Sequence, residues 1–130
     1  MNIQGSTVII TGGGTGIGRG LALEFAKAGA NTVVAGRRAE KLDETVRLVE
    51  NGSGKALAVP TDITDRKQVR TLVETAIARF GAIDVLFNNA GRFQSIAGAH
   101  EVDPEEWWHD VTVNLYGPLL MIRETLPHML

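Results

Sequence analysis

A glycine-rich turn between an apolar run and a helical pattern constrains this chain more than any other feature. Residues 7–11 form a β-branched apolar run, and Thr11–Gly18 then carries five glycines in eight residues. From Ile17 onward, apolar residues recur every four positions, which predicts a helix closed by Gly29. Glycines allow a tight turn, and the free N–H groups that open a helix can bind a phosphate. The segment therefore predicts a nucleotide-binding turn; the alternative is a purely structural turn.

The rest of the chain repeats this order of elements. Apolar runs predict strands over residues 7–11, 32–35, 56–59 and 83–87, and helical spacing predicts helices from Ile17 and over residues 39–50 and 65–80. This alternation predicts one α/β domain over residues 1–130, a Rossmann-like doubly wound parallel sheet truncated after four strands. Ligands of such sheets lie at the carboxyl ends of the strands. We therefore expect Thr11–Gly18 and Asn88–Gly91 to meet at one crevice.

The last third of the chain predicts a further helix after a loop over residues 92–102. Asp103 is a suitable N-cap, and Glu106 stands at the third helical position, from which it is expected to bond back to the cap. Asn114, Gly117 and Pro118 are expected to interrupt the helical spacing, which resumes as far as residue 126.

Composition excludes several classes of function. The 130 residues carry a net charge of −2, which gives no basic field for nucleic acid. Cysteine is absent and the three histidines lack ligand spacing, so no metal site is predicted. The sequence shows no signal peptide and no run long enough to span a membrane. We expect a cytoplasmic protein that binds neither nucleic acid nor membrane.

Four motifs in order resemble the short-chain dehydrogenase/reductase family over residues 5–130. They are the turn Thr11–Gly18, the segment Asn88–Gly91, Asp62 after the third predicted strand, and Asn114. The resemblance implies a nicotinamide cofactor held by Gly12, Thr15, Gly16, Ile17, Gly18, Arg37, Arg38, Asp62, Ile63, Asn89, Ala90 and Gly91.

The end of the second predicted strand bears on which cofactor is bound. Proteins of this fold that prefer NAD usually carry an acid there for the ribose 2′-OH, whereas this chain carries Arg37 and Arg38. A guanidinium can bind a 2′-phosphate, so NADP(H) is the preferred cofactor and NAD(H) the alternative. The two arginines can also be solvated loop charges. Asp62 is expected to accept the adenine amino proton with Ile63 beside the ring, or else to form a turn with Thr64.

The remaining motif residues have structural and functional interpretations side by side. A branched side chain at Gly18 is expected to intrude on the pyrophosphate and leave the fold intact. The resemblance gives Asn88 the task of holding the sheet beside the cofactor, while Ala90 and Gly91 leave room for a ribose. It also implies that Asn114 holds a water in a proton relay; a simple kink of the helix is the alternative.

The reaction of this family, as the resemblance implies, needs a serine and a Tyr-x-x-x-Lys pair, and none of these matches appears before Leu130. We interpret the chain as the cofactor-binding half of an oxidoreductase that transfers hydride between the nicotinamide and a small carbonyl or alcohol substrate. By itself it is expected to be inactive. The alternatives are a non-catalytic nucleotide-binding regulatory protein and an assembly partner. The last helix is expected to form a homo-oligomer contact.

Overall fold

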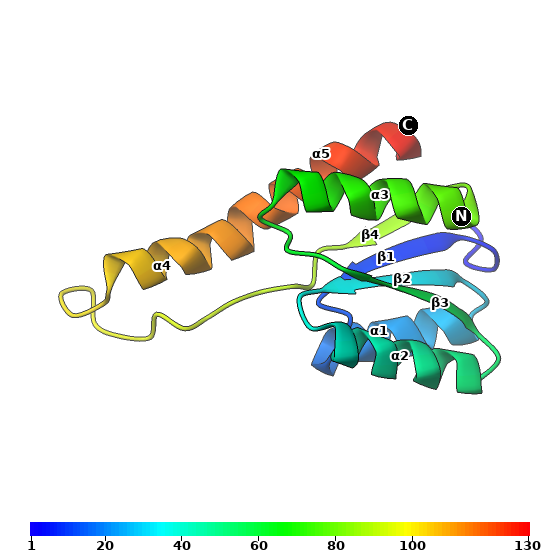
Figure 1. The fold of residues 1–130 in the computed structure, drawn as a ribbon, viewed down its shortest axis with the longest axis horizontal. Coiled ribbons are helices and arrows are strands. Elements are labelled where there is room, and N and C mark those ends of the chain that lie inside the picture. Colours follow the sequence, from blue (N-terminus) through cyan, green and yellow to red (C-terminus); the bar gives the residue numbers. More distant parts are fainter.

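A four-stranded parallel sheet forms the centre of the molecule. The computed structural model describes all residues from Met1 to Leu130 and places the strands in the order β3-β2-β1-β4 (Figure 1). The strands are β1 (Thr7–Thr11), β2 (Asn31–Gly36), β3 (Lys55–Pro60) and β4 (Val85–Phe87). The predicted doubly wound α/β fold is confirmed, because chain order reverses direction across the sheet after β3.

Helices cover both faces of this sheet. The first pair, α1 (Gly16–Lys27) and α2 (Ala39–Asn51), lies on one face, and α3 (Arg66–Phe80) and α5 (Gly117–Met129) lie on the other (Figure 1). Two further segments, α4 (Pro104–Val111) and the π-helix η1 (Thr112–Tyr116), run directly into α5 and project beyond the sheet. None of these helices has the combined length and apolarity that crossing a bilayer would demand.

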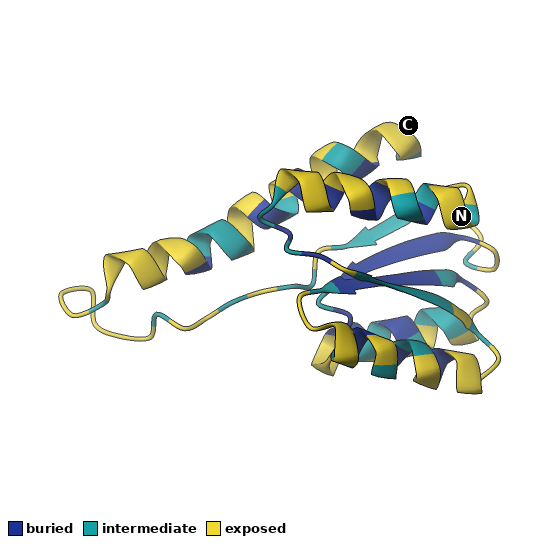
Figure 2. Ribbon diagram, in the orientation of Figure 1, coloured by how far each residue is buried: buried dark blue, intermediate teal, exposed yellow.

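The alternation of side chains along β1 and β2 divides the core into two layers. Ile9 and Val33 pack with α3 and α5, whereas Val8, Ile10 and Val34 pack with α1 and α2. Every residue of β1 is buried, as Figure 2 shows for the centre of the sheet. Strands buried on both faces read as continuous apolar runs, which is why residues 7–11 were recognisable in the sequence. Each such side chain contributes about 1.5–3 kcal/mol on burial.

The fourth strand is shorter than predicted because a side chain replaces part of its ladder. The carboxylate Oδ2 of Asp84 accepts the main-chain N–H of Thr7 at 2.7 Å, and the Asp84 N–H donates to the Thr7 carbonyl at 2.9 Å. Regular pairing with β1 therefore begins only at Val85. This strand lies at the edge of the sheet.

The α-helical spacing is interrupted at Asn114, as predicted, but by the π-helix η1 and without a break in the helix. The helical turns widen through η1, where the N–H of Gly117 donates to the carbonyl of Thr112, and Pro118 follows at the start of α5 without a break. A Cβ at Gly117 would lie 2.5 Å from the side chain of Ile63. Gly117 therefore serves close packing of the helix rather than its termination.

The start of α4 confirms the predicted cap in part. The Asp103 carboxylate accepts the N–H of Glu105 at 3.1 Å, as an N-cap should. The expected return bond from Glu106 is absent, because its carboxylate instead binds the guanidinium of Arg92 at 2.6 Å. A charged partner outcompetes a main-chain N–H that water can also satisfy.

One face of the long helix is apolar and exposed. Figure 2 shows exposed stretches along α4, η1 and α5. The exposed apolar side chains include those of Trp108, Leu115, Leu119, Ile122 and Leu126. The contact between copies expected through the last helix stays a prediction.

Candidate functional site

A cleft of about 500 Å³ opens where the carboxyl ends of the strands meet. The turn after β1, the end of β2, the loop after β3 and the segment after β4 all line it. Eleven of the twelve residues predicted to bind a cofactor lie on its walls: Gly12, Thr15, Gly16, Ile17, Arg37, Arg38, Asp62, Ile63, Asn89, Ala90 and Gly91. The fold thus brings together residues that are up to 79 positions apart in sequence, as the hydrogen bond between Thr11 and Ala90 illustrates.

The twelfth residue, Gly18, lies behind the turn rather than in the cleft. A Cβ at this position would lie 2.0 Å from the carbonyl oxygen of Gly12 and 2.6 Å from Nδ2 of Asn89. The sequence-based expectation was that a side chain at Gly18 would meet the pyrophosphate and leave the fold intact. This is wrong, because the side chain would meet protein atoms of the turn itself. The absent side chain lets the start of α1 pack directly against the turn.

Two glycines of the turn adopt a backbone conformation that L-residues avoid. Gly12 has a φ of +67° and Gly16 a φ of +54°. These values let the chain reverse between β1 and α1 at little cost. The positive φ values explain why glycine occurs at these two positions.

The amino end of α1 leaves main-chain donors free beside the cleft. The side chain of Thr15, the N-cap residue, forms no capping bond, and no acidic residue stands in the first turn. The N–H groups of Gly16 and Ile17, which both line the cleft, have no acceptor in the protein. Free N–H groups and the positive end of the helix dipole favour an anion such as a phosphate.

Asn89 ties the ends of β1 and β4 together. Its Nδ2 donates to the carbonyls of Thr11 and Gly12, at 3.1 and 3.2 Å. The Thr11 hydroxyl in turn accepts the N–H groups of Asn89 and Ala90, at 3.1 and 3.0 Å. Asn88, to which the sequence interpretation gave this task, is exposed, and its side chain forms no hydrogen bond in the structure. The role is real but belongs to the neighbouring residue.

Side chains from α1 and α2 hold the glycine turn from behind, and the sequence interpretation missed them. Arg19 donates to the carbonyl of Gly14 at 2.6 Å and to Oε2 of Glu44 at 3.0 Å. The hydroxyl of Thr45 donates to the carbonyl of Gly13 at 2.8 Å. The hydrogen bond from Arg19 holds the pKa of Glu44 below its ordinary value. No local pattern links these residues, because 26 positions separate Arg19 from Thr45.

Cationic side chains gather where β2 ends. Arg37 and Arg38 line the main cleft and, with Lys41, also a smaller recess of about 90 Å³ beside the glycine turn. Neither arginine forms an ion pair or a side-chain hydrogen bond, and both are exposed. This end of the cleft therefore holds unpaired positive charge.

Asp62 occupies the cleft and also forms the turn that was its alternative role. Its Oδ1 accepts both the N–H and the hydroxyl of Thr64, at 2.9 and 2.7 Å. Burial acts to raise the pKa of Asp62, but the bonds from Thr64 outweigh it, and Arg37 and His109 add to the lowering. Asp62 is therefore a fixed carboxylate, and Ile63 beside it packs beneath the helix that carries Asn114.

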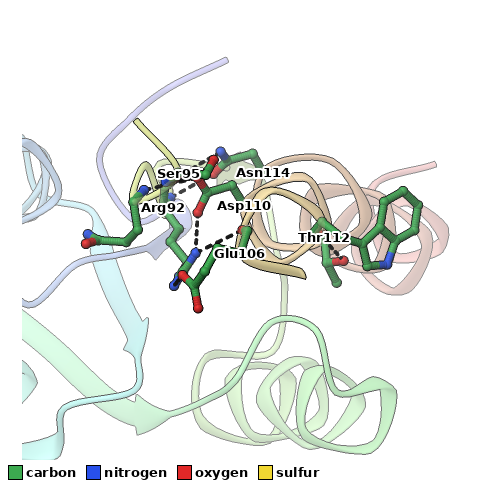
Figure 3. A network of polar contacts seen from close by, with 8 residues as sticks. Arg92, Ser95, Glu106, Asp110, Thr112 and Asn114 are labelled. Atoms are coloured by element: carbon green, nitrogen blue, oxygen red, sulfur yellow. Dashed lines mark hydrogen bonds and ion pairs between the residues drawn. The ribbon is translucent and has the colours of Figure 1, made fainter. Parts of the chain in front are cut away.

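Asn114 lies in η1, and its side-chain amide binds both the N–H and the carbonyl group of Arg92 (Figure 3). Its Oδ1 accepts the N–H of Arg92 at 2.8 Å, and its Nδ2 donates to the Arg92 carbonyl at 2.6 Å. This contact was anticipated by neither the proton-relay nor the kink interpretation. It joins the helix to the segment that follows Gly91.

Together these features define a class of protein. A parallel sheet with a glycine turn after its first strand, free helix N–H groups and a cleft at the reversal of strand order is the arrangement of Rossmann-type dinucleotide-binding domains. Comparison with known proteins narrows this class. The family described as short chain dehydrogenase matches residues 6–130. The chain belongs to this family of oxidoreductases.

Individual relatives agree with this assignment. Glucose 1-dehydrogenase 2 of Bacillus subtilis is 34% identical over 130 residues, which cover 99% of this chain and 50% of that protein. The structure of a metagenomic short-chain oxidoreductase in complex with NADP superposes with a TM-score of 0.92 at 30% identity, covering 99% of this chain and 58% of the other. A short chain dehydrogenase/reductase from Burkholderia phymatum in complex with NAD gives 0.95 at 31% identity, covering 100% and 46%.

These relatives bear on two points of the sequence interpretation. The chain spans about half the length of the curated relatives that it matches. Solved structures of similar fold contain NADP, NADH or NAD, so a nicotinamide cofactor is supported as a class.

Proposed function

We propose that this chain binds NADP(H) in the cleft at the carboxyl ends of its strands, in preference to NAD(H). The pyrophosphate would meet the free N–H groups of Gly16 and Ile17. The adenosine half would lie over β2 and β3, between Arg37 and Asp62, and the nicotinamide half on the β4 side, beside Asn89–Gly91. The topology supports this placement, because dinucleotides in this type of fold lie across the point where strand order reverses.

The observation that carries the preference is the unpaired positive charge of Arg37 and Arg38 after β2. Both line the small recess beside the glycine turn, and no carboxylate lies on it. Lys41 also lines the recess, but its Nζ lies 3.8 Å from Oε1 of Glu44. A ribose 2′-phosphate carries charge that a guanidinium can bind through two parallel hydrogen bonds. A contact of this kind contributes about 1.5–3 kcal/mol, which corresponds to roughly tenfold or more in affinity.

The chemistry of the whole protein is part of the same proposal. When bound, a reduced nicotinamide would supply hydride to a small carbonyl, and an oxidised nicotinamide would accept hydride from an alcohol. The residues described here bind and orient that cofactor, and Asn114 fixes the wall beside the nicotinamide half. The proton-transfer residues of the family, Tyr-x-x-x-Lys, have no match within these 130 residues. We infer that these residues supply cofactor binding and that turnover needs the proton-transfer pair.

Calorimetric titration with NADPH and NADH tests the proposal. The unaltered chain should bind NADPH at least about tenfold more tightly than NADH. Arg37→Glu should remove most of that ratio by opposing the 2′-phosphate, whereas NADH affinity should change little. Arg47→Glu is the matched control, because it makes the same charge change on an exposed part of α2 outside the cleft. Equal affinities for the two cofactors, or an unchanged ratio in Arg37→Glu, would refute the role of Arg37.

A further inference from the structure

Three polar residues form a stripe along α4 and η1, and all three bind Arg92. Glu106, Asp110 and Asn114 follow one another at a spacing of four, which places them on one side of the helix (Figure 3). Asn114 holds both main-chain groups of Arg92, while Glu106 and Asp110 bind its guanidinium. One side of the helix is thus committed to a single residue of the preceding loop.

Asp110 extends this anchoring to the next residues of the loop. Its Oδ1 pairs with Nη1 of Arg92, and its Oδ2 accepts the N–H of Gln94 at 3.0 Å, the N–H of Ser95 at 2.9 Å and the Ser95 hydroxyl at 2.6 Å. The residue is only 5% exposed. A buried carboxylate with four donors is a strong anchor, because each charge-assisted bond is made in a site from which water is largely excluded.

The electrostatics of the cluster agree with this geometry. The Ser95 hydroxyl acts most strongly to lower the pKa of Asp110, to about 2 against the opposing effect of burial, and the Ser95 N–H, Arg92 and the Gln94 N–H add to it. The hydrogen bond to Glu106 in turn raises the pKa of Arg92. Both groups are therefore charged throughout the physiological range.

The anchored segment is continuous with the wall of the cleft. Gly91 and Arg92 line the cleft directly after Asn89 and Ala90, at the end where the topology puts the nicotinamide half. Beyond Arg92 the chain has no regular secondary structure before α4, and the side chains of Phe93 and Ile96 are exposed. Little besides the stripe on α4 and η1 thus fixes the position of this wall.

We propose that Asp110 and Arg92 are positioning residues that hold segment Gly91–Ser95 in place as the wall of the nicotinamide half of the cleft. Neither side chain needs to touch the cofactor, because the effect passes through the main chain of Arg92. The inference rests on the proposed cofactor site. Without the bonds of Asp110 and Arg92, cofactor binding would have to order segment Gly91–Ser95, and the entropy cost would lower the affinity. Only a ligand that reaches this segment would bind more weakly.

Two ligands separate positioning from general stabilisation. NADPH spans the whole cleft, whereas adenosine 2′,5′-bisphosphate carries its adenine, ribose and 2′-phosphate but no nicotinamide. Calorimetric affinities for both should be measured on the full chain and on Asp110→Asn and Arg92→Met. Asn keeps the size of Asp110 but removes its charge, and Met keeps the aliphatic stem of Arg92 while its main-chain bonds to Asn114 persist. Glu105→Gln is the matched control, since Glu105 is an exposed carboxylate on the same helix outside the cluster.

We expect both variants to bind NADPH about tenfold more weakly and to bind adenosine 2′,5′-bisphosphate within about twofold of the unaltered chain. The bisphosphate also reports on folding, because a variant that binds it normally has an intact adenosine half. Ser95→Ala should give a smaller loss in the same direction. Unchanged NADPH affinity, or equal losses for both ligands, would overturn the positioning role. If the unaltered chain binds neither ligand, the proposed cofactor site itself is refuted.

Discussion

The replacement of Gly18 by alanine tests how the glycine turn is built. The added Cβ would lie 2.0 Å from the Gly12 carbonyl oxygen and 2.6 Å from Nδ2 of Asn89. Neither neighbour is free to move, since Asn89 bonds to the carbonyls of both Thr11 and Gly12. The structure therefore predicts that Gly18→Ala destabilises the protein even when no cofactor is bound.

The size of the effect follows from these contacts. The Gly12 oxygen would have to move about 1.4 Å to reach ordinary van der Waals contact at 3.4 Å. Such overpacking costs about 1–3 kcal/mol, and each hydrogen bond lost from Asn89 adds about 1 kcal/mol. Alanine recovers about 1 kcal/mol through its higher helix propensity. With one of these hydrogen bonds lost, the net loss of unfolding free energy is roughly 1–3 kcal/mol.

Urea denaturation of the cofactor-free protein measures this loss. Gly20→Ala is the matched control, because it lies in the same helix with no atom within 4 Å of its added Cβ. It should gain up to about 1 kcal/mol. The contrary result would be a Gly18→Ala protein that is as stable as the unaltered chain without cofactor and is weakened only in NADPH binding. The added Cβ would then clash with the cofactor, and our account of the turn would be wrong.

Two further predictions concern caps and carboxylates. Asp65 accepts the N–H groups of Lys67 and Gln68 at the start of α3, so Asp65→Ala should lower the unfolding free energy by about 0.5–2 kcal/mol, measured by denaturation. Because the pKa of Asp110 is lowered to about 2, its ionised form stabilises the fold fully above its ordinary pKa near 4, and this stability is lost as pH falls through about 2. The stability gap between the unaltered chain and Asp110→Asn should accordingly shrink between pH 4 and pH 2; a constant gap would contradict the assignment.

The sequence predicted the architecture because the signals for it are local. The run at residues 7–11 is apolar throughout since both faces of β1 are buried, and the stripe on α3 repeats at helical spacing because one face packs on the sheet. The predicted start of the fourth strand was wrong because a side chain there accepts a hydrogen bond that a main-chain carbonyl would otherwise accept. This side chain is that of Asp84, whose carboxylate takes the place of a strand partner for Thr7.

The candidate site was predicted only as far as its motifs extend. Motif residues such as Gly12 and Asn89 were found from spacing, and the structure places them on one cleft. The side chains that hold the turn and the loop in place were missed. Arg19 and Asp110 bind residues that no periodic pattern in the sequence connects to them. Asn114 was singled out as unusual in a helix, but its partner Arg92 lies 22 residues earlier and only the fold reveals it.

The side chains that bind the carbonyls of the glycine turn explain why the turn should select an anion. Three successive carbonyls of the turn accept hydrogen bonds from neighbouring elements: Gly12 from Asn89, Gly13 from Thr45 and Gly14 from Arg19. The negative ends of these peptide groups are thereby neutralised, whereas the N–H groups at the start of α1 keep no partner. A glycine turn alone could bind either sign of charge, because it exposes both donors and acceptors. With its acceptors occupied, this turn offers a ligand only donors, which is what a pyrophosphate requires.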